Sequence, residues 1–556
     1  MPAPAAIVLA DMLAAYGVTH LFQVPAVLRR TLAELERRHP DIARITTHGE
    51  KAAAYMADGY ARVALRPGVC AAQVVGALNL AAGLREPHLA GSPVLALTGG
   101  RLPATAFRHV YQEVDDRPAF DEVTKFNASI DDPDRFPDML RQAFRVAVSG
   151  RPGPVHLQVQ GNEGQLDTGL TDEPARIDPL FAAVPPFRPL PEQASLDAAL
   201  EALLSAARPV IVAGGGVRSS HAGAALVALA EALSIPVATS PNGKDTIPGT
   251  HPLSVGVAGT YSRESANQVV NAADLVCFVG TRAGGMTTHF WTVPAPGVRA
   301  IQIDIDPSVL GQNYPLAVAL AGDARRTLEE LLRLAPATPA RDGWLAQVGR
   351  IKASWAARYR DVLTSDAIPI RPERICAALT DGLPSDAVLV TDTGHAGMWM
   401  AQFHDMTAAG QSYLRSAGHL GWAVPAGIGA KAAAGSRPVV VFTGDSGLYY
   451  HLAEIETAVR WNLATVIVVN NNDGGNQSKR GFDRAYEGAA TDRSREMWTF
   501  HPVDFARIAS EMGALGIRVD KPSELAGALD RGLSAGRPVV IDVHTDIDVI
   551  APVPVV

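Results

Sequence analysis

The 556-residue sequence has few cysteines, no basic blocks and no long apolar runs, and each shortage excludes a class of protein. Its three cysteines (Cys70, Cys277 and Cys376) are far apart and odd in number, so we expect neither a disulfide framework nor a CxxC metal site, and a cytoplasmic location fits best. With 49 Lys and Arg against 57 Asp and Glu, no nucleic acid is expected as a partner. No apolar run reaches the roughly 20 residues of a membrane span, and no basic stretch opens the sequence, so we expect neither a membrane nor export.

What the sequence does contain is globular: 47 % hydrophobic and 19 % charged residues, over a length that predicts several domains. Short β-branched apolar runs recur between Ala- and Leu-rich stretches. Runs that are apolar without alternation indicate strands buried on both faces. We therefore predict an α/β fold of parallel, doubly wound sheets. The predicted strands are Val94–Leu97, Pro154–Val159, Val210–Val212, Leu275–Val279, Ala300–Ile305, Val388–Val390, Val439–Phe442, Val466–Val469 and Val539–Val543.

Two breaks divide the chain. Six prolines fall between Pro174 and Pro191, a spacing typical of an extended connector. A second break lies around Pro336 to Arg341. We predict three domains, at residues 1–175, 192–335 and 370–556.

The last domain carries a candidate metal site. Strand Val439–Phe442 leads into Gly444-Asp445-Ser446, a helix is expected over 448–461, and strand Val466–Val469 leads into an Asn run that ends in Gly474-Gly475. In such a βαβ unit both strand ends reach one edge of the sheet, so Asp445 and Asn472 can meet. Their side-chain oxygens and the Gly474 carbonyl suit Mg²⁺, and the nearby helix N-terminus suits a diphosphate. Either segment alone would be interpreted as a turn; together they favour a metal site.

The first domain carries a candidate acid. Glu50 shares a helical stripe with Ala54, Ala57 and Ala61, which places a carboxylate at the start of a face made for burial. A buried carboxyl has a raised pKa unless it is paired, which suits a group that exchanges a proton. The alternative is that Glu50 only complements the helix dipole at the surface.

Together these segments resemble the thiamine diphosphate (ThDP) enzymes, whose signature is Gly-Asp-Gly, about 30 residues and Asn-Asn, with Ser446 here at the third position. The segment from His48 to Arg62 resembles the family's catalytic-glutamate segment, and the resemblance covers about residues 3–548. The stretch from Gly444 to Asn472 looks most like the 2-hydroxyacyl-CoA lyase and oxalyl-CoA decarboxylase branch. One departure is Val24-Pro25-Ala26, where relatives commonly have Gly after Pro. The resemblance implies a pyrimidine-binding, a central Rossmann-like and a diphosphate-binding domain.

By this resemblance Glu50 would hydrogen-bond the aminopyrimidine ring of ThDP and so assist ionisation of the thiazolium carbon. In the family this glutamate and the diphosphate site come from different subunits. The resemblance therefore implies at least a homodimer, and we expect a homotetramer.

The remaining site residues also come from the resemblance. Gly76 and Asn79 match the glycine-rich loop over the cofactor, and Tyr111 and Gln112 match a segment beside the reacting carbon, which makes them catalytic candidates with Glu50. The implied cofactor contacts are Glu50, Gly76, Asn79, Gly394, His395, Gly418, His419, Leu420, Gly444, Asp445, Ser446, Asn472 and Gly474. Among these Leu420 is the apolar wedge under the bent cofactor and Gly418 offers its carbonyl. The implied Mg²⁺ ligands are Asp445, Asn472 and Gly474.

The central domain has glycines after a strand at Gly214-Gly215-Gly216 and an acid at Asp304, a pattern that permits a nucleotide. In relatives this domain binds FAD, ADP or nothing, and the sequence leaves these alternatives open. The segment Gly280 to Gly285 lacks the acidic residues that usually follow this Arg in acetolactate synthases, which argues against FAD.

We therefore predict a ThDP- and Mg²⁺-dependent carbon–carbon lyase or carboligase of the acetolactate-synthase-like superfamily, acting on small 2-oxo acids or 2-hydroxy carbonyl compounds through a ThDP carbanion or enamine. One alternative is a 2-hydroxyacyl-CoA lyase or oxalyl-CoA decarboxylase, although residues 550–556 offer no basic residue to cover CoA. Others are a nucleotide-dependent oxidoreductase, which leaves Glu50 and Asp445 without a role, and a silent regulatory paralogue, against which the presence of Glu50 argues.

Overall fold

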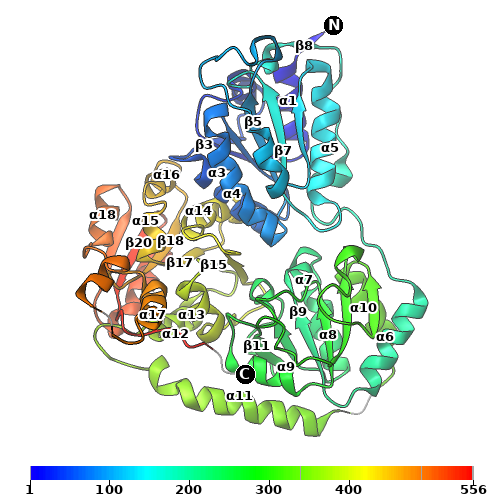
Figure 1. The fold of residues 1–556 in the computed structure, drawn as a ribbon, viewed down its shortest axis with the longest axis vertical. Helices are drawn as coiled ribbons and strands as arrows, with labels where there is room; N and C mark the ends of the chain where they lie inside the picture. The colour runs from blue at the N-terminus through cyan, green and yellow to red at the C-terminus, as the bar shows by residue number, and fades with distance from the viewer. Residues whose placement is uncertain (1, 338–339, 490, 554–556) are drawn as a thin grey trace.

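Three six-stranded parallel sheets, each enclosed by helices, make up the fold (Figure 1). The computed structural model describes residues 2–337, 340–489 and 491–553. One sheet falls within each of the three predicted ranges, and all nine predicted strands are present within a few residues of their expected ends. The predicted α/β class is confirmed. In the described part of the chain no helix is both long and apolar enough to cross a bilayer.

The first sheet has the strand order β3-β2-β4-β5-β7-β6. Its strands are β2 (His20–Gln23), β3 (Ala43–Thr46), β4 (Gly68–Ala72), β5 (Val94–Gly100), β6 (Asn127–Ile130) and β7 (Val155–Gln160). Its helices are α1 (Ala5–Ala15), α2 (Arg29–Arg38), α3 (Glu50–Ala64), α4 (Ala77–Ala90) and α5 (Phe136–Val148). The short strands β1 (Ala3–Pro4) and β8 (Leu170–Thr171) pair antiparallel beside it.

The second sheet has the order β11-β10-β9-β12-β13-β14, which is the order of dinucleotide-binding folds. Its strands are β9 (Pro209–Ala213), β10 (Val237–Thr239), β11 (Ser254–Val257), β12 (Leu275–Val279), β13 (Arg299–Asp304) and β14 (Val318–Ala321). Its helices are α6 (Gln193–Ser205), α7 (Gly215–Ser219), α8 (Gly223–Ala232), α9 (Glu264–Ala272) and α10 (Ala324–Leu334). The long helix α11 (Asp342–Leu363) runs along the lower edge of Figure 1 toward the third domain.

The third sheet, ordered β16-β15-β17-β18-β20-β19, repeats the topology of the first. Its strands are β15 (Val388–Thr391), β16 (Ser412–Arg415), β17 (Val439–Gly444), β18 (Thr465–Asn471), β19 (Leu515–Val519) and β20 (Val539–His544). Its helices are α12 (Pro372–Gly382), α13 (His395–Phe403), α14 (Ala423–Ala434), α15 (Asp445–Tyr449), α16 (Glu454–Arg460), α17 (Asn476–Ala485), α18 (Phe505–Glu511) and α19 (Leu525–Ser534).

The helix expected over 448–461 is wrong as a single element, because α15 and α16 are separated by a turn. The break brings the buried His451 edge-on to the Tyr55 ring of α3, with the two ring centroids 5.6 Å apart. The turn between α15 and α16 therefore makes a contact with the first domain at the point where a continuous helix was expected.

The first and third domains share one hydrophobic core, built around the contact of α3 with α14. The two helices touch backbone to backbone. A methyl group at Gly59 would overlap the Ala426 carbonyl, and one at Gly429 would overlap the Met56 carbonyl. Only glycine fits at these two crossings.

The central domain is tied to the third domain by buried charged groups. Arg263 pairs with Asp405 at 2.8 Å, and the Lys244 ammonium donates to the His404 carbonyl at 2.6 Å. These contacts join the turns after β10 and β11 to the end of α13.

Candidate functional site

Asp445 and Asn472 lie together at the carboxyl edge of the third sheet. Asp445 directly follows β17 and Asn472 directly follows β18, two neighbouring parallel strands. The Asp445 carboxylate accepts hydrogen bonds from the backbone N–H groups of Ser446 (2.6 Å), Gly474 (2.9 Å) and Asn472 (3.2 Å). The prediction that Asp445 and Asn472 lie close together in space is confirmed. Burial raises the pKa of Asp445 to about 6.

The donor set at this edge fits a hard divalent cation. The Asn472 Oδ1 atom is buried and accepts no hydrogen bond from the described residues, an arrangement that leaves an oxygen free for a ligand. The described residues contain no cluster of three or more His, Cys, Asp or Glu able to hold a metal. An ion here would therefore use one carboxylate, the Asn472 amide oxygen and backbone oxygens such as that of Gly474, which are ligands that Mg²⁺ accepts.

Gly394 and His395 lie at the N-terminus of α13, just after β15. Gly394 has a φ of 68°, and His395 Nδ1 contacts the Asn476 side-chain oxygen. The His395 Nε2 atom is buried without a hydrogen-bond partner among the described residues. Burial lowers the pKa of His395 to about 4, so the ring is neutral at physiological pH. Neighbouring strands β15 and β17 mark the point where the strand order reverses, which is where open α/β sheets bind ligands.

Gly418, His419 and Leu420 belong to the loop between β16 and α14. We call residues Ser416–Leu420 the cofactor loop, because three of the predicted cofactor contacts lie in it. Leu420 is 47 % exposed, and a methyl group at Gly394 would lie 3.9 Å from its Cδ2 atom. The loop therefore lies beside the β15 end, and Gly444 and Ser446 flank Asp445 on the next strand end.

Asp392 is a member of this site that the sequence analysis did not select. It follows β15, is buried, and accepts hydrogen bonds from the Gly421 N–H and the Thr443 hydroxyl, each at 3.1 Å. Burial raises its pKa to about 7. Its position directly after a largely apolar strand, as for Asp445, was the available signal.

The candidate residues of the first domain form a second group. Glu50 begins α3, and its Oε2 atom accepts a hydrogen bond from the Asn79 side chain at 3.2 Å. A methyl group at Gly76 would overlap the Glu50 carboxylate, so any side chain there would displace Glu50 from its present position. The stripe of Ala54, Ala57 and Ala61 is fully buried as expected, whereas Glu50 itself stays partly exposed in the single chain.

Gln112 joins this group and Tyr111 does not. The Gln112 Oε1 atom accepts hydrogen bonds from Gln73 (3.0 Å) and Asn162 (3.1 Å), beside the turn that contains Gly76. Tyr111 is 78 % exposed. Exposed apolar side chains surround this region, and we call them the first-domain patch: Val75, Leu78, Phe107, Val110, Tyr111 and Val114.

A cleft of about 490 Å³ opens at the carboxyl ends of β9, β12 and β13. Its central-domain wall includes Gly215, Gly216, Arg282 and Asp304, while the first domain contributes Arg151 and the third contributes Arg415. Burial lowers the pKa of Arg151 to about 10, a value that keeps it cationic at neutral pH. Glycines, cations and an acid at the switch point of this strand order suit a nucleotide.

Comparison with known proteins agrees with this geometry. Residues 5–119 match the thiamine pyrophosphate enzyme N-terminal TPP binding domain, thiamine pyrophosphate being another name for ThDP. Residues 196–331 match the central domain of the same enzymes. Residues 392–543 match their C-terminal TPP binding domain.

Relatives that match over most of this chain belong to enzymes of the same kind. The chain is 32 % identical to a probable acetolactate synthase large subunit of Methanocaldococcus jannaschii, over 91 % of this chain and 86 % of the relative. It is 35 % identical to a probable 2-ketoarginine decarboxylase of Pseudomonas aeruginosa, over 84 % and 81 %. It is 29 % identical to a glyoxylate carboligase of Escherichia coli O157:H7, over 93 % and 88 %. The chain therefore belongs to the ThDP-dependent enzymes of the acetolactate synthase superfamily.

Proposed function

We propose that this enzyme is a Mg²⁺-requiring carbon–carbon lyase or carboligase that acts on 2-oxo acids or 2-hydroxy carbonyl compounds. The observation that carries the proposal is the Asp445–Asn472 site, with a buried carboxylate beside an amide oxygen that has no partner among the described residues. Two relatives are named for small 2-oxo acids, glyoxylate and 2-ketoarginine, which supports the substrate class.

The proposed roles at the diphosphate end follow from this donor set. Asp445, Asn472 Oδ1 and the Gly474 carbonyl would hold Mg²⁺, and the ion would bind the diphosphate. The backbone of Gly394, Gly444 and Ser446 would approach the same anion closely. His395, neutral and with a free Nε2, would face it without adding a charge.

The proposed roles at the pyrimidine end belong to the first domain and the cofactor loop. Glu50 would hold a proton at a pyrimidine nitrogen, Asn79 would orient Glu50, and Gly76 would leave space for both. Leu420 would support the bent cofactor, the Gly418 carbonyl would accept its amino group, and His419 would complete the loop. Bound ThDP would supply a nucleophilic carbon for the substrate carbonyl and a sink for the electron pair of the broken bond. Gln112 would hydrogen-bond the substrate oxygen. Tyr111, which is exposed in the single chain, would reach that oxygen only after a change of position on assembly.

We propose that the active enzyme is at least a homodimer and assembles further into a tetramer. Glu50 is partly exposed in the single chain and lies next to the exposed first-domain patch. Leu420, Tyr449 and Tyr450 are exposed apolar residues beside the Asp445 site. Clustered exposed apolar side chains favour a protein interface, and a partner subunit would bring Glu50 to a diphosphate site.

We also propose that the central cleft binds a nucleotide diphosphate, with FAD or ADP as the two candidates. Its volume, its glycine turns and the cations Arg151 and Arg282 support this proposal. An absorption spectrum with flavin bands in the purified protein would identify FAD. Release of ADP on denaturation, measured by mass spectrometry, would identify the other.

The alternative of a 2-hydroxyacyl-CoA lyase or oxalyl-CoA decarboxylase remains a candidate, because the stretch from Gly444 to Asn472 resembles that branch of the family.

One experiment distinguishes an enzyme that acts on free 2-oxo acids from one that acts on acyl-CoA esters. The purified protein, with ThDP and Mg²⁺, is given pyruvate, glyoxylate, aromatic 2-oxo acids or acyl-CoA esters, and the products are identified by mass spectrometry. Conversion of free 2-oxo acids supports the proposal, conversion of CoA esters alone supports the alternative, and absence of Mg²⁺-dependent ThDP binding by calorimetry would overturn both.

A further inference from the structure

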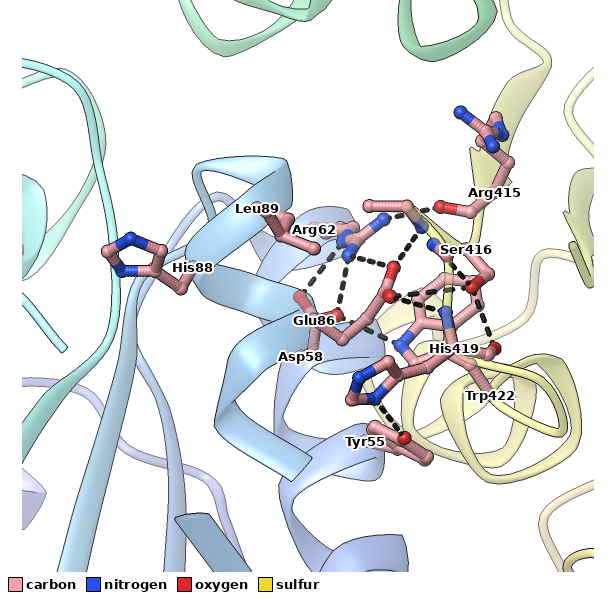
Figure 2. Close-up of polar contacts among 12 residues, drawn as sticks. Tyr55, Asp58, Arg62, Glu86, His88, Leu89, Arg415, Ser416, His419 and Trp422 are labelled. Atoms are coloured by element: carbon pink, nitrogen blue, oxygen red, sulfur yellow. Dashed lines mark hydrogen bonds and ion pairs between the residues drawn. The ribbon is translucent and has the colours of Figure 1, made fainter. Parts of the chain in front are cut away.

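Glu86 is a buried carboxylate that faces the back of the cofactor loop. It lies near the C-terminal end of α4 and is fully buried. Figure 2 shows it between Arg62 and the backbone that leads from Arg415 to His419. Its Oε1 atom accepts the backbone N–H of Ala417, and its Oε2 atom accepts the backbone N–H of His419 at 3.2 Å and the Ser416 hydroxyl at 3.3 Å.

Two further residues of the first domain hold the ends of the same loop. Arg62 donates to the Arg415 carbonyl at 2.7 Å, just before the loop. Asp58 accepts the Trp422 indole N–H at 2.9 Å, just after it. Arg62 also pairs with Asp58 at 2.6 Å and with Glu86 at 3.4 Å, so one guanidinium lies between two buried carboxylates.

This position is a costly one for a carboxylate. Glu86 is removed from water, Asp58 repels it, and the C-terminal end of a helix disfavours negative charge. An apolar side chain would avoid these costs and fill the same space. What an apolar side chain could not do is accept the N–H groups of Ala417 and His419.

The side of the cofactor loop that faces away from Glu86 makes few contacts. None of the hydrogen bonds found among the described residues ends on the Gly418 carbonyl, and a methyl group at Gly418 would meet nothing within 4 Å. Leu420 is 47 % exposed. His419 is turned away toward α3, where its Nδ1 atom lies 2.6 Å from the Tyr55 hydroxyl.

We infer that Glu86 is a positioning residue, which fixes the backbone of Ser416–Leu420 so that the Gly418 carbonyl and the Leu420 side chain face the cofactor. The inference rests on the proposed function, because the open face of the loop has a role only if ThDP binds there. Glu86 itself touches no cofactor. Its effect is transmitted through three hydrogen bonds to the loop.

The test measures ThDP affinity in the full-length Glu86→Gln variant. The carboxamide keeps the size of the side chain but offers only one acceptor oxygen to the loop, and its NH₂ group would oppose a backbone N–H. We expect the Kd for ThDP, measured by calorimetry with Mg²⁺, to rise about tenfold. With ThDP at saturation, the KM for substrate should stay within about twofold, because the loop does not bind substrate.

Asp167→Asn is the matched control. Asp167 is also a buried carboxylate of the first domain that accepts a backbone N–H and a hydroxyl, both from Thr31. Its amidation should leave the ThDP affinity unchanged. Equal weakening in both variants would mean a general loss of structure and would overturn the inference, as would an unchanged Kd in Glu86→Gln.

Hydrogen exchange of the wild type, without ThDP, gives a second measurement that needs no variant. The N–H groups of Ala417 and His419 should exchange at least tenfold more slowly than in an unstructured chain, and exchange at the unstructured rate would overturn the inference. Failure of the wild type to bind ThDP would instead count against the proposed function and is distinguishable from both outcomes.

Discussion

The Asp445 carboxylate accepts a hydrogen bond from the backbone N–H of Asn472 at 3.2 Å, although the two residues are 27 positions apart in sequence. This contact fixes the geometry of the proposed Mg²⁺ site. We predict that Asp445→Ala lowers the affinity for ThDP in the presence of Mg²⁺ by about a hundredfold, because a buried charged ligand is lost. Calorimetry measures the effect.

The control for this prediction is Asp473→Asn, which removes a neighbouring charge that has no proposed ligand role. Asn tolerates the φ of 55° found at this position. Its affinity for ThDP should stay within about threefold of the wild type. Undiminished affinity in Asp445→Ala would show that the ion binds elsewhere.

Glu50→Gln should separate binding from turnover. The amide keeps the hydrogen bond to Asn79 within reach but cannot exchange a proton, so turnover should fall by about a hundredfold or more while ThDP still binds. Steady-state rates and calorimetry on the same preparation give both quantities. Glu36→Gln, on the exposed side of α2, should change neither; an unaltered rate in Glu50→Gln would refute the role.

Ala26 occupies a strained backbone conformation with a φ of 85°. The resemblance to the ThDP enzymes predicts Gly at this position, and the structure keeps a turn that glycine would prefer. Ala26→Gly should raise the free energy of unfolding by roughly 1 kcal/mol, because positive φ is unfavourable for a side chain with a Cβ atom. The change would appear as a higher thermal midpoint.

The control is Ala183→Gly, at a φ of −149°, where alanine is unstrained. Here glycine only increases the freedom of the unfolded chain, so the midpoint should fall slightly. A decrease of the same size in both variants would show that Ala26 is not strained.

Lys244 predicts a dependence of stability on pH. Burial lowers the pKa of Lys244 to about 7, in surroundings that include Arg263, His404, Asp405 and Cys376. The unfolded chain keeps the proton up to pH 10.5, whereas the folded chain releases it at about 7, so unfolding takes up a proton between these values. Rising pH therefore stabilises the fold in this window.

Comparison with Lys244→Met isolates this contribution from other titrating groups. Between pH 6 and pH 9 the wild type should gain roughly 3 kcal/mol relative to the variant. Thermal midpoints of both proteins across this range measure it. Parallel pH profiles would mean that Lys244 keeps its charge in the fold.

The sequence predicted the parts of the site that depend on local pattern. Asp445 and Asn472 could be paired because each follows a buried apolar strand, and the handedness of the crossover brings neighbouring strand ends together. The short strands β2 (His20–Gln23) and β6 (Asn127–Ile130) were not predicted, because each contains polar residues and too few consecutive apolar residues to form a recognisable run.

The contacts between domains could not be predicted in the same way. Glu86 and Ala417 are 331 positions apart, and no local periodicity encodes such a pairing. The one available signal was a charged residue among the apolar residues of α4, such as Leu80, Gly83 and Leu84, which are buried on more than one face of the helix. A buried polar residue in such a helix requires partners, but the sequence does not say which.

The backbone contact of α3 with α14 at Gly59 and Gly429 limits how the molecule can move. When two packed helices slide past one another, the side chains between them change rotamers. At Gly59 and Gly429 backbone carbonyl groups lie directly against glycines, so no side chain is present there to adjust. Sliding of α3 along α14 is therefore disfavoured. Any opening of the proposed site is therefore expected to come from exposed segments rather than from relative movement of these two helices.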